Sequence, residues 1–487
     1  MVHPSAQRSA HYETKELTNY GTNMTHVHFI GIGGSGLSAI ARLLLESGYT
    51  VSGSDRALTP FAEEVRKAGA TVYVGHHPRN LTGADWVIRS SAITEDNPEF
   101  KGAQLAGIPV YKRSDFLGRL MEDKTGVAIA GTHGKTTTTG MTAWVLSQLG
   151  RDPSFIVGGT VNNLGVNAHA GSGNIFVIEA DEYDNMFLGL KPQIAVVTSL
   201  EHDHPDFFPT LESMYHAFEK FVDLLPGDGT LIVCAEDTGA AALIPHARNQ
   251  GINVISYGMQ NEMTINTPLW MQARNVKPNE RGGFDFSAMT NLAGKTSASV
   301  KVSLQVPGQH NVRNALAVLT IVSVLGLSRR KAAQALGEFT GTGRRFELRG
   351  EVNGIRIYDD YAHHPTEIKA TLAGARARFP GARIWAVWQP HTYSRTKTLF
   401  LDFARAFKDA NEVIVTEVYA AREPKEEFTS AEVVSAMPHF SARYIKTLAE
   451  VTDYLLQHLR SGDVVLVLSA GDADQISAGV LKGLQER

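Results

Sequence analysis

The chain has 487 residues, which is long enough for about three domains of ordinary size. Its net charge of -4 gives no general attraction to nucleic acid, and 43% hydrophobic residues with 45 glycines are typical of a soluble α/β protein. The single cysteine, Cys234, excludes an internal disulfide and a cysteine-based metal site. We therefore expect no nucleic-acid partner and a buried strand thiol at Cys234.

The first residues, 1–24, predict an N-terminal tail ahead of the first strand. They lack an apolar core of signal-peptide length, and no later stretch reaches the roughly 18 apolar residues of a membrane span. We expect a cytoplasmic protein without a membrane partner, present as a monomer or weak homodimer.

Residues 25–122 alternate strand-like and helix-like stretches, beginning with HVHFIGI at 26–32 and TVSGSD at 50–55. Between them, Gly31, Gly33 and Gly36 form G-x-G-x-x-G, with Asp55 at the end of the second strand. This pattern is typical of dinucleotide binding, and it also fits any nucleoside joined through a diphosphate. Two classes stay open here: an NAD(P)-dependent oxidoreductase, or an ATP-using enzyme that acts on a nucleotide-linked substrate.

A second segment, residues 123–338, opens with the apolar strand VAIA and the loop GTHGKTTTT at 131–139. Gly134, Lys135 and Thr136 supply the last three elements of a phosphate-binding loop, but Ile129 stands where its first glycine belongs. Backbone N–H groups at such a helix start can hold phosphate, the lysine can neutralise the β and γ oxygens, and the threonine can bind Mg²⁺. We therefore predict ATP and Mg²⁺ as cofactors.

Carboxylates follow the next apolar strand, in IFVIEADEYD. Glu179 ends the apolar run, so it is the expected Mg²⁺ ligand beside the loop. Of Asp181, Glu182 and Asp184, at least two are expected to be solvated acids at a helix start.

Another motif, SLEHDHPD, places His202, His204 and Asp206 after a further strand. HxHxD also opens one type of zinc hydrolase site, but Phe207 stands where that site has another histidine. The neighbouring ATP loop favours a Mg²⁺ or substrate contact through His204 instead.

The third segment, residues 339–487, again alternates strands and helices, with polar clusters in GIRIYDDYAHHP and RIWAVWQPHTYSR. His364 is expected to cap a helix that starts at Pro365.

Several motifs occur in the order found in the Mur ligases, which the chain resembles from about Met24 onward: the first glycine loop, AGTHGKTTTT, EADEYD, EHDHPD, GQHNVRNALA, FTGTGRRFE, DDYAHHPTE and QPHTYSRT. The resemblance implies an α/β fold of three domains. Residues 25–122 would form a Rossmann-like domain that binds a UDP-sugar, 123–338 a central P-loop ATPase-like domain with a parallel sheet, and 339–487 a Rossmann-like domain that binds an amino acid.

The resemblance also implies the reaction. It is closest to members that ligate L-alanine to the lactyl carboxylate of UDP-N-acetylmuramate through an acyl phosphate, releasing ADP and phosphate for peptidoglycan synthesis. A murein-peptide recycling ligase, which adds a tripeptide to the same sugar nucleotide, is the alternative within the family. QPHTYSR favours the single amino acid.

Carried over residue by residue, the resemblance assigns four groups of site residues. Catalytic roles fall on Lys135, Glu179, His204 and His363, with Thr136, Glu179 and His204 as metal ligands. ATP binding falls on Gly131, Thr132, His133, Gly134, Lys135, Thr136, Thr137, His310, Asn314, Arg345 and Asp360. UDP-sugar binding falls on Gly31, Gly33, Gly34, Ser35, Gly36, Asp55, Ser90 and Ser91. Amino-acid binding falls on Tyr361, His363, His391 and Arg395.

Two positions depart from the family pattern. Thr392 stands where some members have an arginine, and Ala362 where many have glycine. The threonine puts in doubt how many cations bind the substrate carboxylate.

Overall fold

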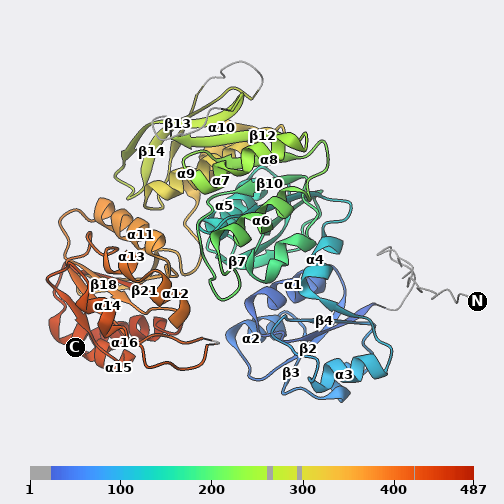
Figure 1. Cartoon of the computed structure of the whole chain (residues 1–487), viewed down its shortest axis with the longest axis horizontal. Coiled ribbons are helices and arrows are strands. Elements are labelled where there is room, and N and C mark those ends of the chain that lie inside the picture. The colour runs from blue at the N-terminus through green and yellow to red at the C-terminus, as the bar shows by residue number, and fades with distance from the viewer. Residues whose placement is uncertain (1–23, 260–266, 293–298, 422) are drawn as a thin grey trace, which may run out of the picture.

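The computed structural model describes residues 24–259, 267–292, 299–421 and 423–487. Within them the strands form three sheets that follow one another along the chain and occupy separate lobes (Figure 1). The α/β fold with parallel sheets is confirmed. The domain boundaries at 122/123 and 338/339 stay predictions, and residues 1–23 of the expected tail lie outside the described residues. The described parts of the chain contain no helix with the length and apolarity of a membrane span.

The first sheet is parallel throughout. Its elements are β1(His26–Ile30), α1(Ser35–Glu46), β2(Thr50–Asp55), α2(Pro60–Lys67), β3(Thr71–Val74), η1(Pro78–Leu81), β4(Trp86–Arg89), α3(Pro98–Leu105), β5(Val110–Lys112) and α4(Arg113–Leu120). The strand order is β3-β2-β1-β4-β5. Successive strands are therefore added on one side of β1 as far as β3, and on its other side from β4 onward. Ligands bind at such a switch point, outside the carboxyl ends of the strands.

The central sheet is parallel from β13 to β7 and carries antiparallel strands at both edges. Its elements are β6(Thr125–Ala130), α5(Lys135–Gln148), β7(Ser154–Val161), β8(Val166–His169), β9(Ile175–Glu179), η2(Tyr183–Gly189), β10(Ile194–Val197), α6(Leu211–Val222), β11(Thr230–Cys234), α7(Thr238–Ala241), α8(Leu243–Asn249), β12(Asn253–Met259), β13(Leu269–Pro278), β14(Phe284–Thr290), β15(Val300–Ser303), α9(Gln309–Val324) and α10(Arg329–Glu338). The order β15-β14-β13-β12-β11-β10-β6-β9-β7-β8 places β6 between β9 and β10. The polar residues that follow these three strands therefore meet at one edge.

Helix α5 is held by apolar packing on the central sheet. Met141, Trp144 and Val145 are buried in the same cluster as the buried face of α9, and the Trp144 indole N–H donates to the Ala335 carbonyl at 2.8 Å. This packing fixes the start of α5, and with it the phosphate loop.

The third sheet carries one antiparallel strand, β16, on an otherwise parallel arrangement. Its elements are β16(Glu347–Val352), β17(Ile355–Asp360), α11(Pro365–Arg378), β18(Ile384–Trp388), α12(Tyr393–Thr398), α13(Phe400–Ala404), β19(Glu412–Val415), α14(Ala431–Ser435), β20(Ala442–Tyr444), α15(Leu448–His458), β21(Val464–Leu468) and α16(Asp474–Gln485). The order β16-β17-β21-β18-β19-β20 brings the ends of β17 and β18 to the same edge of the sheet. The polar clusters of the third segment lie there.

Candidate active site

The phosphate loop connects β6 to α5, as the sequence predicts. Gly131 and Gly134 have φ of 128° and 81°, conformations that favour glycine. A Cβ atom at Gly131 would lie 2.2 Å from the Thr198 hydroxyl oxygen, so the loop also needs glycine for space. The first turn of α5 carries no acidic residue. The free N–H groups and positive end of the helix can therefore accept an anion.

Lys135 lies beneath this loop. Its Nζ donates to the Gly131 carbonyl at 2.6 Å and forms an ion pair with Glu182 at 2.8 Å. Burial lowers the pKa of Lys135, but the surrounding carboxylates outweigh burial and raise the pKa above its ordinary value. The ammonium group is therefore charged, and its contacts tie the loop to Glu182.

Glu182 is a site residue that the sequence analysis did not single out. Asp184 is exposed and Asp181 partly buried, in keeping with solvated acids, but Glu182 is fully buried. It contacts Lys135, and its Oε1 lies 3.6 Å from Nε2 of His204. Its position just before the 3-10 helix η2 turns it inward, which its place in EADEYD does not reveal.

Thr136 and Glu179 lie together at the expected metal site. The threonine hydroxyl donates to Glu179 Oε1 at 2.9 Å, and the Gly158 N–H donates to Oε2 at 2.6 Å. Burial raises the pKa of Glu179, and the charge of Lys135 opposes that rise. A hydroxyl and a partly buried carboxylate are oxygen ligands of the kind Mg²⁺ prefers, so these residues fit the ion.

His204 joins the same group from the loop after β10. Burial lowers the pKa of His204, but Asp203 and Glu182 outweigh burial and raise the pKa above its ordinary value. The other members of HxHxD point elsewhere: Nε2 of His202 contacts the Phe208 carbonyl at 2.8 Å, and Asp206 accepts from the Tyr183 hydroxyl at 3.1 Å. The motif therefore does not form a zinc hydrolase site.

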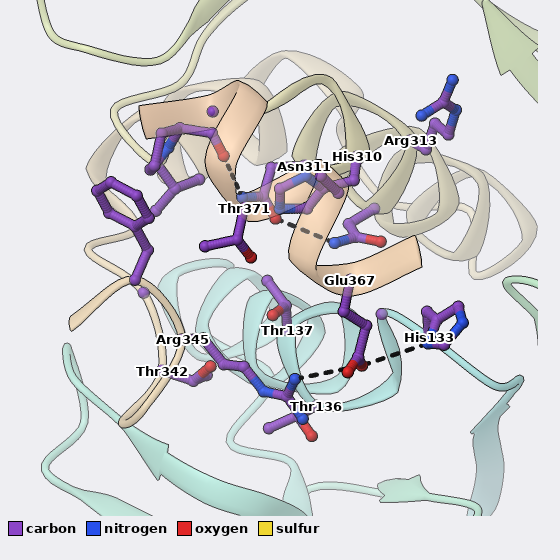
Figure 2. Close-up of a pocket in the computed structure, with 18 of the residues that line it drawn as sticks. His133, Thr136, Thr137, His310, Asn311, Arg313, Thr342, Arg345, Glu367 and Thr371 are labelled. Atoms are coloured by element: carbon purple, nitrogen blue, oxygen red, sulfur yellow. Dashed lines mark hydrogen bonds and ion pairs between the residues drawn. The ribbon is translucent and has the colours of Figure 1, made fainter. Parts of the chain in front are cut away.

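A cavity of about 570 Å³ lies beside the phosphate loop, between the central and third sheets (Figure 2). Predicted ATP-binding residues that line it are His133, Gly134, Thr136, Thr137, His310, Asn314, Arg345 and Asp360. Gly131, Thr132 and Lys135 lie behind this lining: Thr132 is buried, with its N–H on the Ser199 carbonyl at 3.0 Å. The cavity thus collects residues that are far apart in the sequence.

The α9 end of the cavity is polar. Burial and the nearby Arg313 lower the pKa of His310 to about 4. Asn314 donates to the side chain of Asn311 at 3.0 Å, which in turn donates to the Pro307 carbonyl at 2.7 Å. Asn311 also lines the cavity and was missed, although it lies in GQHNVRN beside the two predicted residues.

Cys234 lies at the end of β11 and lines the cavity. It is buried, as predicted, and burial raises the pKa of the thiol to about 12. The thiol therefore stays protonated.

The third-sheet side of the cavity carries charge. Arg345 and His133 both face Glu367 in Figure 2, at 3.6 and 3.3 Å. Asp360 accepts backbone N–H groups from Ala362 at 2.7 Å and from Phe346 at 2.8 Å, while burial raises the pKa of Asp360 to about 6. Asp360 thus orders the turn that carries Arg345. Glu367 was not predicted, and its only sequence signal is its place in HHPTE.

The predicted amino-acid residues also come together. Ring centroids of Tyr361 and His363 are 5.4 Å apart, and those of His363 and His391 are 5.9 Å apart. Arg395 Nη1 lies 3.2 Å from His391 Nδ1, and its Nη2 lies 2.8 Å from Oδ1 of Asp203 in the central domain. Arg395 is therefore already held by a buried carboxylate that the sequence analysis did not assign.

One of the two departures from the family pattern has a local explanation. Thr392 has φ of 68°, and its side chain accepts from the Arg395 N–H at 3.4 Å, so it caps α12. Ala362 is fully buried, and His364 caps α11 as expected.

In the first domain, the glycine loop binds its own acidic residue. The Gly33 N–H donates to Asp55 Oδ2 at 2.8 Å, so this carboxylate braces the loop. Gly34 and Ser35 are exposed at the start of α1, and Ser90 and Ser91 follow β4 on the other side of the switch point. The predicted sugar-nucleotide residues thus surround one helix start.

Arg113 is a further residue that the sequence analysis missed. A Cβ atom on Gly36 would lie 2.2 Å from its guanidinium carbon, so the side chain covers the start of α1. Its Nε is buried without a hydrogen-bond partner. Burial lowers the pKa of Arg113, while Asp181 and Glu179 of the central domain act in the opposite direction. Arg113 therefore lies between the sugar-nucleotide loop and the expected metal site.

Comparison with known families matches all three parts of the chain. Residues 26–125 match the Mur ligase family catalytic domain, 129–322 the Mur ligase middle domain, and 344–471 the Mur ligase glutamate ligase domain. The chain belongs to the Mur ligase family. The predicted resemblance is confirmed, and family membership disfavours the dinucleotide-dependent oxidoreductase.

Relatives cover nearly the whole of this Mur ligase. It is 42% identical over 466 residues to UDP-N-acetylmuramate--L-alanine ligase of Desulfosudis oleivorans, covering 95% of this chain and 99% of the relative. The enzyme of the same name from Renibacterium salmoninarum is 42% identical over 469 residues, covering 96% and 97%.

Solved structures agree with these relatives. UDP-N-acetylmuramate-alanine ligase MurC from Thermotoga maritima has a TM-score of 0.76 at 29% identity, covering 95% of this chain and all of that one. A murein peptide ligase from Psychrobacter arcticus has a TM-score of 0.69 at 26% identity, covering 95% and 99%.

Proposed function

We propose that this Mur ligase joins L-alanine to the lactyl carboxylate of UDP-N-acetylmuramate, with ATP converted to ADP and phosphate, in peptidoglycan precursor synthesis. The observation that carries the proposal is the contact between Arg395 and Asp203, at 2.8 Å, which holds the amino-acid cluster beside His204. The full-length relatives named for this ligation support the choice of substrates. An amine site next to a phosphoryl-transfer site is what the ligation requires.

The phosphates of ATP are assigned to the start of α5. Its free N–H groups and Lys135 stabilise the negative charge that moves during phosphoryl transfer. Thr136, Glu179 and His204 would hold Mg²⁺, which neutralises charge on the phosphate oxygens when bound. Glu182 holds Lys135 in place at 2.8 Å, so the lysine is oriented before the nucleotide arrives.

The adenosine end is assigned to the α9 end of the cavity. His310, Asn311 and Asn314 offer hydrogen-bond donors and acceptors for the adenine base there. Arg345, paired with Glu367, lies on the phosphate side of the same cavity.

The lactyl carboxylate takes up the γ-phosphoryl group, and the amine of L-alanine then attacks the acyl phosphate. Tyr361, His363 and His391 surround the amine, and Arg395 is assigned to its carboxylate. His363 Nδ1 lies 2.9 Å from the Tyr361 carbonyl, to which it can donate. Burial lowers the pKa of His363 to about 3, so the ring is neutral and its Nε2 can accept a hydrogen bond from the amine.

UDP-N-acetylmuramate is assigned to the first domain. The free N–H groups at the start of α1 suit its diphosphate, and Arg113 adds a cation beside them. Because Arg113 also faces Glu179 and Asp181, it connects the sugar-nucleotide site to the central domain.

Phosphate release from ATP tests the proposal. UDP-N-acetylmuramate and L-alanine are supplied singly and together with Mg²⁺, and rapid release is expected only when both are present. A tripeptide that outcompetes L-alanine would assign the chain to murein-peptide recycling. Phosphate release that does not depend on either substrate would contradict the ligase. Tight NADH binding without phosphate release would contradict it as well.

A further inference from the structure

A second group of metal-binding side chains lies beside the phosphate loop. His133, Glu201 and His364 each offer a ligand atom, and these atoms lie within 4.8 Å of one another. In the described stretches of the chain, this is the one group of histidine, cysteine and acidic side chains that could share a metal ion. It uses none of Thr136, Glu179 and His204, the residues assigned to Mg²⁺.

The two imidazole rings converge on the carboxylate of Glu201. His133 Nε2 contacts Glu201 Oε1, and Nδ1 of His364 lies 3.6 Å from the same oxygen. The two imidazole rings are 4.8 Å apart between centroids. In a tetrahedral zinc site with bonds of about 2.0 Å, ligand atoms lie about 3.3 Å apart. The ligand atoms here lie within 4.8 Å of one another, so a contraction of up to about 1.5 Å would complete the site.

The surroundings are those of a metal-binding histidine. His133 Nδ1 lies 3.3 Å from Glu367 Oε1, so a carboxylate orients the ring from its other side. His364 is 4% exposed, and its Nε2 is buried without a hydrogen-bond partner. Its Nδ1 accepts only a long hydrogen bond from the Thr366 N–H, at 3.3 Å. This weak hydrogen bond offers little opposition to metal binding by the ring.

The local charge also favours a cation. Glu201 and Glu367 flank His133; burial lowers the pKa of His133, but the two carboxylates outweigh burial and raise it to about 10. Arg345, 3.6 Å from Glu367, offsets only part of this negative charge. A divalent cation that binds here replaces the proton on His133.

We propose that His133, Glu201 and His364 form a Zn²⁺ site that joins the central and third sheets. Two imidazoles and a carboxylate suit zinc better than magnesium, and three protein ligands leave a fourth position for water or a phosphate oxygen. His133 and Glu201 also line the 570 Å³ cavity, so that position opens toward it. His133 and Glu201 follow β6 and β10, whereas His364 lies between β17 and α11. The ion therefore connects the start of α11 to the phosphate loop.

Zinc binding to the full chain tests the site directly. Equilibrium dialysis with Zn²⁺ is carried out in excess Mg²⁺, comparing the wild type with Glu201→Gln and His364→Asn. Asparagine is a good helix cap, so His364→Asn keeps the start of α11 while removing the imidazole. We expect one Zn²⁺ per wild-type chain and affinities at least about tenfold lower in both variants. Co²⁺ in place of Zn²⁺ should give the absorption of a tetrahedral site in the wild type only.

A matched control comes from the neighbouring motif. His202→Asn removes a histidine that faces the Phe208 carbonyl and lies outside the group, so zinc affinity is expected to stay unchanged. Hydrogen exchange should show that Zn²⁺ protects the backbone at the start of α11 in the wild type but not in His364→Asn. Equal zinc affinity in the wild type, Glu201→Gln and His364→Asn would assign the metal to exposed histidines and overturn the site. No bound zinc in the wild type would overturn it as well.

Discussion

Arg395 and Asp203 form a buried ion pair between the third and central domains. Nη2 lies 2.8 Å from Oδ1, Nε donates to the same oxygen at 2.9 Å, and the two side chains are only 3% and 4% exposed. The same Oδ1 accepts the His204 N–H at 2.7 Å, where the backbone has φ of 53°. The pair therefore fixes the His204 loop and the amino-acid cluster in one arrangement.

Arg395→Ala is expected to reduce kcat/KM for L-alanine by at least about 100-fold. It removes the guanidinium proposed for the substrate carboxylate and leaves Asp203 as a buried charge without its partner, which typically costs about 3 to 5 kcal/mol. Steady-state kinetics with saturating ATP and sugar nucleotide measure the change.

A double-mutant cycle with Asp203→Ala separates these two effects. If the ion pair fixes the His204 loop, the double variant loses less kcat/KM than the product of the two single losses. Fully multiplicative losses would show that the two residues act independently.

Lys135→Ala is expected to abolish phosphate release while leaving the affinity for UDP-N-acetylmuramate near normal. The variant removes the cation at the phosphate loop, whereas the sugar nucleotide is assigned to another domain. Calorimetry for the sugar nucleotide and a phosphate assay measure the two properties.

Two further variants support the Lys135 comparison. Glu182→Gln keeps the lysine but removes its buried ionic partner at 2.8 Å, so kcat should fall by about tenfold without complete loss. Lys191→Ala removes an exposed lysine that pairs with Glu122, and it should behave as the wild type. Full activity in Lys135→Ala would show that the loop is not part of the ATP site.

The local parts of the site could be predicted from the sequence. A strand, two glycines and an apolar helix face specify the phosphate loop, because these signals lie within a few turns of one another. Glu179 follows from the same reasoning, since the carboxyl ends of adjacent parallel strands meet at one edge.

The partners of those residues could not be predicted. Asp203 and Arg395 are 192 positions apart, and only the packing of two domains brings them together. In the sequence, Glu182 is one of several acidic residues in EADEYD, and nothing distinguishes it from the others. Its burial depends on the turn before η2. Arg113 faces the start of α1 and the carboxylates of another domain, and no local pattern marks it.

His363→Asn is expected to make stability less sensitive to acid. Burial lowers the folded-state pKa of His363 to about 3, whereas the ordinary value is 6.5. Between these values the unfolded chain binds a proton that the folded chain does not, so this contribution to stability is present above pH 6.5 and lost as pH falls. The free energy of unfolding changes through this group by at most about 1.4 kcal/mol per pH unit.

Urea unfolding at pH 7 and pH 5 measures this effect. The wild type should lose about 1 to 2 kcal/mol more than His363→Asn over that interval. His216→Asn is the control, because that side chain is 64% exposed and lies on α6 away from the site. An equal loss in the wild type and His363→Asn would show that His363 takes up a proton in the folded state.

Gly36→Ala tests the position of Arg113. Alanine is normally favoured over glycine within a helix, by about 1 kcal/mol, so α1 itself tolerates the change. The new Cβ would lie 2.2 Å from the Arg113 guanidinium carbon, however, and must displace that side chain. We expect KM for UDP-N-acetylmuramate to rise about tenfold while KM for ATP stays unchanged, because one charge-assisted contact contributes roughly 1.5 kcal/mol.

Arg113→Ala should give the same rise in KM for the sugar nucleotide. Gly36→Ala added to Arg113→Ala should cause little further loss, because the side chain that the methyl group displaces is already gone. Arg119→Ala is the matched control: this arginine is on the same helix, α4, but lies over the ring of Tyr111 at 4.6 Å. An unchanged KM for the sugar nucleotide in Arg113→Ala, or multiplicative losses in the double variant, would contradict the placement of the diphosphate beside Arg113.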